Sequence, residues 1–203
     1  MRRAQAVLAV GRTLVWCVGL APVAWIAYGI TNDALGAEPV REMQHVTGLS
    51  TLIALLCSLA VTPLRQVSGV AELVRLRRPI GLFAFFHASL HLLTYVVFDQ
   101  SLDVALIVED IIEHPWVLAG FTGWLIMVPL AATSTAGMIR RLGGARWRML
   151  HRGVYLAAIA GVLHFLWLVK KDVREPYLYA AILAVLLLAR LPLWKRRRRT
   201  AIA

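Results

Sequence analysis

Three histidines of this chain lie inside or at the mouth of long apolar runs: His91, His151 and His164. An ionisable ring inside the hydrocarbon of a membrane is costly, and such a ring usually marks a functional position. A neutral imidazole binds metal ions through a ring nitrogen, and it can also take up or release a proton near neutral pH. Ligation of an iron or haem group and proton relay are therefore the two chemistries that these residues suggest.

Long apolar runs dominate the rest of the sequence, in which 60% of the residues are hydrophobic. A helix that crosses the hydrocarbon layer needs roughly 20 such residues. The pattern predicts an all-α integral membrane protein, a six-transmembrane-helix bundle that forms one domain over residues 1–203. The first run follows two arginines, as in a signal peptide, but it is too long for one, so we expect a retained helix. The predicted helices cover residues 10–30, 46–62, 80–98, 116–134, 150–169 and 177–194.

Prolines mark the expected helix ends. Pro63, Pro79, Pro115 and Pro176 each fall close to a predicted boundary. Proline lacks an amide donor and clashes with the preceding turn, so it favours helix margins. Pro129 lies inside the fourth predicted helix, where we expect a bend.

The net charge of +11 is distributed unevenly along the chain. Arginines gather in alternate connections between the predicted helices, whereas the connection over 99–113 is acidic. Because basic connections stay in the cytoplasm, this alternation predicts that both termini are cytoplasmic. We therefore expect the basic residues to set orientation and contact membrane lipid, with no nucleic acid as a partner. The basic residues of this side are Arg2, Arg3, Arg65, Arg75, Arg77, Arg78, Arg140, Arg141, Arg146, Arg148 and 195–199.

His91 and His164 are predicted to lie at one depth in the membrane. The third and fifth predicted helices run in the same direction, and a rise of about 1.5 Å per residue puts both rings about 8 to 10 Å inside the outer margin. Two neutral imidazoles at one height on neighbouring helices can hold a haem b through both axial positions. The spacing therefore predicts a haem suited to electron transfer. The structural alternative is a pair of interior histidines bonded to backbone or hydroxyl groups.

His151 is predicted to lie near the cytoplasmic face, about 20 Å along the same helix from His164. The two rings would point about 140° apart unless the helix is tilted or has an irregular turn near Gly153 or Gly161. A further haem at His151 would lack an evident second ligand. His87 lies one turn before His91, and we expect it to form a hydrogen bond or relay a proton rather than hold zinc.

Four stretches together carry a family resemblance over nearly the whole chain. They are LGAEPVREMQHVTG at 35–48, VTPLR at 61–65, RRPIGLFAFFHASLHLLTY at 77–95, and ATSTAGMIRRLG at 132–143 with the continuation RWRMLHRGVYLAAIAGVLHFLWLVK at 146–170. In these stretches the chain resembles the MsrQ (YedZ) family, the haem-binding membrane subunits of the bacterial methionine-sulfoxide reductase system. That family lies within the ferric-reductase-like transmembrane group.

The resemblance implies a membrane electron-transfer subunit that is not itself catalytic. It implies that His91 and His164 are the axial ligands of a haem b, and that His151 is a third cofactor-binding histidine for a possible further haem. It also implies FMN, for which the sequence indicates no residues. We expect Thr94, Tyr95 and Tyr155 to tune the haem through hydrogen bonds near the ligands.

The resemblance also implies the place of the chain in an electron-transfer route. Electrons would enter from the quinone pool or a cytosolic flavin reductase. They would leave to MsrP, a periplasmic molybdopterin enzyme that reduces methionine sulfoxide in oxidised periplasmic proteins. The expected location is the bacterial inner membrane.

Three other readings of the histidines stay open at this point. One is a quinone-linked cytochrome b that serves another periplasmic or metal-reducing partner. A second is a proton transporter in which the membrane histidines form a relay. The third is an anchoring subunit whose histidines are structural.

Overall fold

The structure, a computed structural model, describes residues 2–190 and the side chains of residues 8–190. Every regular element in this range is a helix, as the sequence predicts. The elements are α1 (Arg2–Thr31), α2 (Pro39–Ser68), the 3₁₀ helix η1 (Ala71–Leu76), α3 (Arg77–Thr94), the π-helical turn η2 (Tyr95–Asp99), α4 (Val104–Glu113), α5 (Pro115–Ala132), α6 (Ala136–Leu142), α7 (Gly144–Leu150), α8 (Gly153–Leu168) and α9 (Arg174–Leu188).

Five helical segments of the described range are long and apolar enough to cross a membrane. The sixth predicted helix, over 177–194, corresponds to α9, a helix of 15 residues. The end of that predicted range, 191–194, lies outside the described residues, so the count of six crossings stays a prediction. The five segments are Leu8–Thr31, Pro39–Ser68, Ala71–Asp99, Pro115–Ala132 and Gly144–Leu168.

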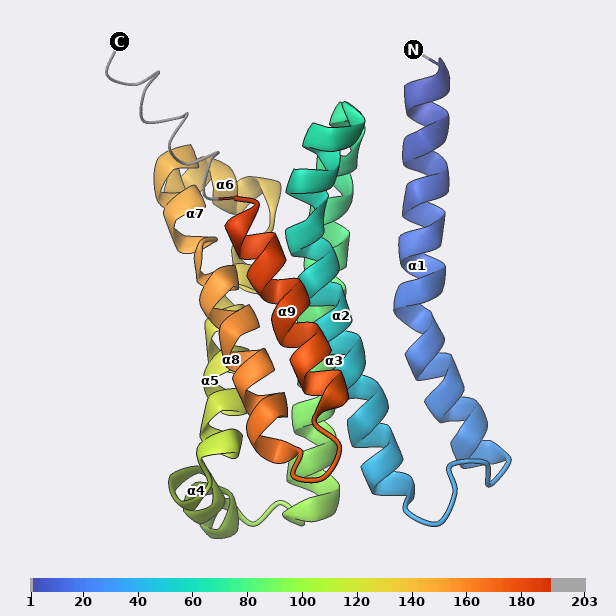
Figure 1. Ribbon diagram of the computed structural model, residues 1–203, viewed down its shortest axis with the longest axis vertical. Coiled ribbons are helices and arrows are strands. Elements are labelled where there is room, and N and C mark those ends of the chain that lie inside the picture. The colour runs from blue at the N-terminus through green and yellow to red at the C-terminus, as the bar shows by residue number, and fades with distance from the viewer. Residues whose placement is uncertain (1, 191–203) are drawn as a thin grey trace.

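The long helices stand side by side and leave short helices at both ends of the bundle (Figure 1). α4 lies across one end, and α6 and α7 lie at the other. The start of α1, the connection between α2 and α3, and the end of α9 lie at the same end as α6 and α7. The arginines of η1, α6 and α7 therefore gather at one end of the bundle, as the predicted orientation requires.

The core consists of two clusters of buried apolar side chains, and both include α2. Because the surfaces of these helices face lipid, this core is small and its close packing relies on alanine. One cluster joins α2 to α8 and α9 through Leu52, Leu56, Leu59, Ala158, Val162 and Leu183. The other joins α2 to α3, α5 and α8 through Leu55, Ala84, Ala88, Met127 and Ala157.

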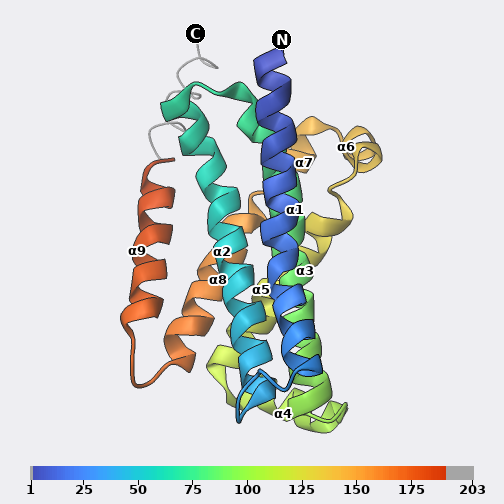
Figure 2. The same cartoon turned by 90° about the vertical axis from the view of Figure 1, so that its right-hand side faces the viewer.

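α1 is attached to this core along one side only. In the view of Figure 2 it runs in front of α2 and α3. Most of its side chains from Leu8 onward are exposed. Gly11 and Gly19 lie against the side chains of Leu76 and Phe83, so α1 approaches η1 and α3 through residues without a side chain.

Pro63 does not end the second helix, contrary to the sequence prediction. α2 continues through it to Ser68 and ends at Gly69, which adopts the left-handed conformation with φ 70°. A proline at position 63 leaves the carbonyl of Leu59 without its usual helical donor. The guanidinium of Arg190, at the end of α9, donates a hydrogen bond to that carbonyl and replaces the missing amide.

The acidic connection over 99–113, expected as a loop, contains helix α4. Asp103 begins this helix, because its carboxylate accepts hydrogen bonds from the backbone amides of Ala105 and Leu106 at 2.8 and 3.3 Å. Val104, Val108 and Ile112 are exposed on its apolar side. An amphipathic helix of this kind fits a position in the plane of a membrane interface.

Candidate functional site

The rings of His91 and His164 meet in the interior of the bundle. His91 lies near the end of α3 and His164 near the end of α8, and their ring centroids are 5.9 Å apart with the ring planes at 81°. The two helices are separated in the sequence by α4 to α7, so only the folded bundle brings the rings together. The sequence predicts only that the two histidines lie at one depth in the membrane, and the structure places their rings side by side.

Each ring is held by a backbone carbonyl of the preceding long helix. Nδ1 of His91 donates to the carbonyl of Gln44 on α2 at 3.0 Å, and Nδ1 of His164 donates to the carbonyl of Trp116 on α5 at 2.6 Å. A carbonyl only accepts hydrogen bonds, so the proton of each neutral ring is on Nδ1. This leaves a lone pair on both Nε2 atoms, which is the tautomer that binds a metal.

A glycine makes room for each ring one turn after the carbonyl that holds it. A Cβ atom at Gly48 would lie 3.1 Å from Cε1 of His91, and one at Gly120 would lie 2.8 Å from Nδ1 of His164. Contacts below about 3.4 Å force a neighbouring group to move. Glycine at these positions therefore lets both rings lie directly on the helix backbone.

The two histidine sites are two copies of one arrangement. In each arrangement, one long helix supplies the carbonyl and, four residues later, the glycine. A second long helix supplies the histidine. The carbonyls lie 47 and 48 residues before their histidines. The pair α2 and α3 thus repeats as the pair α5 and α8, although the sequence shows no evident repeat.

The spacing of the rings fits a metal held between two axial imidazoles. A metal–imidazole bond of about 2 Å and a ring radius of roughly 1 Å on each side place the centroids about 6 Å apart. The observed 5.9 Å agrees with this distance. The lone pairs on Nε2 and the glycines behind the rings meet the further needs of such a site, so the residues fit a haem iron.

His151 is separate from this pair. It lies in the turn between α7 and α8, where its Nε2 is 3.1 Å from the hydroxyl oxygen of Thr133. Its ring stacks on that of Trp147 with the centroids 4.0 Å apart. The chain is irregular here, next to Gly153, as a second site on this helix would require. Among the described residues, no second histidine contacts the His151 ring, and its part in a further haem stays a prediction.

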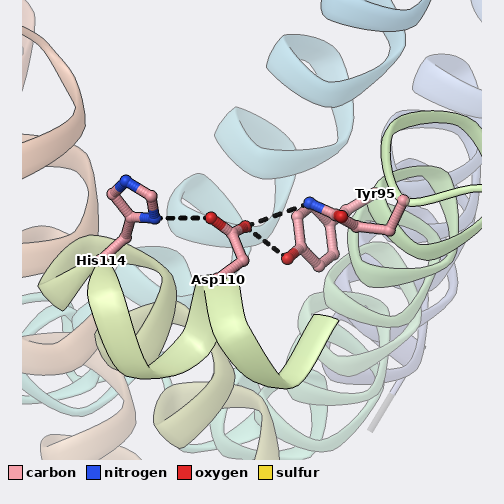
Figure 3. Close-up of polar contacts among 4 residues, drawn as sticks. Tyr95, Asp110 and His114 are labelled. Atoms are coloured by element: carbon pink, nitrogen blue, oxygen red, sulfur yellow. Dashed lines mark hydrogen bonds and ion pairs between the residues drawn. The ribbon is translucent and has the colours of Figure 1, made fainter. Parts of the chain in front are cut away.

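A polar network ties the segment that follows α3, beginning with η2, to α4 (Figure 3). The hydroxyl of Tyr95 donates to the carboxylate of Asp110 at 2.5 Å, and Gln100 donates to the same oxygen at 3.2 Å. The other oxygen of Asp110 is 2.6 Å from Nδ1 of His114. The His114 ring packs on Trp116, whose carbonyl holds His164, with the centroids 4.5 Å apart.

The three residues expected to tune the ligands form their hydrogen bonds elsewhere. Thr94 donates to the carbonyl of Leu90 in its own helix, and Tyr95 donates to Asp110. Tyr155 accepts a hydrogen bond from Arg190 at 2.6 Å. The expectation for these side chains was wrong because depth along a helix does not fix the direction in which a side chain points.

The groups that hold the rings were missed by the sequence analysis. Two of them are backbone carbonyls, which no residue type reveals. The glycines were detectable, because Gly48 and Gly120 stand at similar distances before the two candidate ligands. Thr47 was also missed; it is buried, and its hydroxyl oxygen lies 3.4 Å from Nδ1 of His91.

Comparison with known proteins identifies the family. Residues 46–162 match the family described as ferric reductase like transmembrane component. A protein of Xanthomonas campestris pv. campestris named protein-methionine-sulfoxide reductase heme-binding subunit MsrQ is 49% identical over 199 residues, covering 94% of this chain and 90% of that protein. The chain belongs to the MsrQ family. The resemblance seen in the sequence is thereby confirmed.

Another MsrQ protein, from Ralstonia nicotianae, is 44% identical over 195 residues, covering 95% of this chain and 90% of that protein. As a member of the MsrQ family with five apolar helices of spanning length, the chain is a multi-pass membrane protein. The family match over 46–162 includes Gly48, His91, Gly120 and His151 and ends just before His164.

Proposed function

We propose that this chain is the haem-binding electron-transfer subunit of a methionine-sulfoxide reductase system, with one haem b between His91 and His164. The observation that carries the proposal is the pair of rings 5.9 Å apart, each with its Nδ1 bonded to a carbonyl. The relatives' name, which states haem binding and this reductase system, supports the same function.

The residues around the two rings would keep the iron in one coordination state. Hydrogen bonds from Nδ1 fix the tautomer and the orientation of each imidazole and raise its basicity as a ligand. A haem b held by His91 and His164 would supply reversible one-electron transfer, and the burial of the site and the basicity of the two ligands would set its potential. Because both ligands come from packed helices, α3 and α8, the chain itself holds them close together before any ligand binds.

The reductase that receives the electrons is proposed to be periplasmic MsrP. We place the haem end of the bundle, which carries α4, at the periplasmic face, because the arginines lie at the opposite end. Both termini are then cytoplasmic, and the membrane is the bacterial inner membrane. The donor is proposed to be the quinone pool or a cytosolic flavin reductase. The names of the relatives support haem binding and do not mention FMN, so FMN stays a prediction.

The decisive experiment is spectroscopic. Reduced-minus-oxidised spectra of detergent-purified wild type and of His91→Ala, His164→Ala and His151→Ala, with haem quantification, give the ligands directly. We expect the b-type signal to be lost in the first two variants and largely retained in the third. A partial loss in His151→Ala would reveal a further haem.

His45→Ala is the matched control, because His45 is exposed on α2, the same helix that carries Gln44 and Gly48. It should keep the full signal. A wild type that stays colourless after haem supplementation would contradict the proposal. It would leave proton relay or a structural role for the histidines.

A further inference from the structure

His87 is a buried histidine of α3 that the proposed haem site does not use. Its side chain is only 2% exposed, in the seam between α1 and α3. Nε2 of His87 lies 2.9 Å from the backbone carbonyl of Gly19 on α1. Because a carbonyl only accepts, Nε2 carries the ring proton and Nδ1 holds a bare lone pair.

Nδ1 of His87 has no hydrogen-bond partner among the described residues, although it is shielded from the outside of the bundle. A buried acceptor of this kind is uncommon, since burial without a hydrogen bond costs free energy. The tautomer is the reverse of that at His91 and His164, where Nδ1 is bonded and Nε2 is bare. The seam therefore contains a basic nitrogen aimed away from the carbonyl that holds its ring.

Aromatic rings surround His87 and connect it with the lipid-facing surface. The ring of Phe83 stacks on it at a centroid distance of 6.2 Å, and Phe86 meets it edge-on at 5.3 Å. Trp16 of α1 packs against Phe83 at 5.3 Å. Trp16 is 56% exposed and Phe86 is 39% exposed, so both reach the surface that the bilayer covers.

We propose that the seam between α1 and α3 binds a quinol from the lipid phase, with Nδ1 of His87 accepting a hydrogen bond from a quinol hydroxyl. The chemistry of the seam matches this ligand in three respects. A quinol is a flat ring that stacks between aromatic side chains. It carries an O–H donor for an unpaired acceptor, and its apolar tail keeps it in the bilayer.

The inference rests on the proposed function, because it names the site at which the haem subunit receives electrons. His87 lies one turn from His91, about 6 Å along the α3 axis, so an electron given up here has a short path to the proposed haem. Entry of the ring requires one side chain to move. Phe86 is suited to this, since its exposed face has lipid beside it.

The proton and electron balance of the step is complete. Oxidation of one quinol to a quinone breaks two O–H bonds and releases two protons and two electrons. One proton would pass to Nδ1 of His87 and from there to water, and the other would leave the opposite hydroxyl for water. The two electrons would be accepted one at a time by the haem that His91 and His164 are proposed to hold. Two electrons are what the reduction of one methionine sulfoxide consumes.

The first test is the rate at which decylubiquinol, a short-chain quinol, reduces the haem of the purified protein in stopped-flow. His87→Gln keeps an amide donor for the Gly19 carbonyl but has no basic nitrogen. We expect it to retain the haem and its full reduction by dithionite, with quinol-driven reduction slowed at least tenfold. The control is His45→Gln, which removes an exposed histidine of α2 and should match the wild type.

A wild-type rate in His87→Gln would overturn the inference. The inference would also be overturned if dithionite reduced the haem of the wild type but decylubiquinol did not. In that case the haem would still transfer electrons, but it would receive them from another donor. A wild type without haem would overturn both proposals.

The second test needs no variant and therefore stands even if His87→Gln fails to fold. The wild type is photolabelled with an azidoquinone and the modified peptides are identified by mass spectrometry. Labels on the segments around Trp16 and Phe86, competed by decylubiquinol, are the expected result. Labels confined to other helices would overturn the inference.

Discussion

Gly120 faces His164 so closely that an added Cβ atom would stand 2.8 Å from Nδ1 of the ring. The same relation holds between Gly48 and His91, at slightly longer distances. Neither ring can move back without losing its hydrogen bond to the helix that carries the glycine. The two glycines therefore limit where the rings can lie, although glycine has no side chain with which to bind a cofactor.

Gly120→Ala should displace the His164 ring and lower haem occupancy severalfold, and Gly48→Ala should do so less strongly. The reason is steric, because the new methyl group takes the place of the ring and the Trp116 bond lengthens. Haem per protein, from the pyridine haemochrome of purified samples, measures the effect. Gly81→Ala on α3 is the control, since its Cβ would meet Ser58 at an ordinary 3.7 Å. Equal haem occupancy in all three variants would show that the two glycines do not position the rings.

Arg190→Met should destabilise the fold by about 1 to 2 kcal/mol, because the guanidinium loses its bonds to Tyr155 and to the Leu59 carbonyl. The loss should shrink by roughly 1 kcal/mol when Pro63→Ala restores a helical donor for that carbonyl. Thermal unfolding of the two single variants and the double variant in detergent measures the coupling. Additive effects would show that Arg190 does not substitute for the missing amide.

Tyr95→Phe should loosen α4 from the end of α3, because it removes the hydroxyl that donates to Asp110 at 2.5 Å. A hydrogen bond to a carboxylate contributes about 1.5 to 3 kcal/mol, and partial exposure places this one at the lower end. Hydrogen exchange of the α4 amides should speed up while exchange in α8 stays unchanged. Tyr177→Phe, at an exposed tyrosine of α9, is the matched control. Unchanged exchange in α4 would count against an anchoring role for the network.

The membrane orientation can be tested by cysteine labelling after Cys17 and Cys57 are replaced by alanine. In intact spheroplasts, a membrane-impermeant maleimide should label Ala37→Cys and Asp172→Cys. It should label Ser68→Cys only after permeabilisation, since the connection next to Ser68 carries arginines. If α9 belongs to a sixth crossing, the C-terminus lies in the cytoplasm, and a fluorescent protein that folds only there should fluoresce when it is fused to the C-terminus. The reverse labelling pattern would invert the proposed periplasmic face.

The sequence by itself determined that this is a helical membrane protein and at what depth in the membrane its candidate ligands, His91 and His164, are expected to lie. Hydrophobic runs fix which segments can cross a bilayer, because each unbonded backbone group in lipid is costly and a helix satisfies them all. A constant rise per residue then places His91 and His164 at one height. The family followed from sequence as well, because MsrQ motifs extend over nearly the whole chain.

The tertiary structure decided which groups surround the two rings. The direction of a side chain depends on helix rotation and packing, and these come from the contacts that α2 makes with α3 and α8. The carbonyls of Gln44 and Trp116 carry no signature in the sequence, because every residue has one. Pro63 shows the same limit: a local rule predicts a helix end there, and a distant guanidinium from Arg190 satisfies the carbonyl that the proline leaves free.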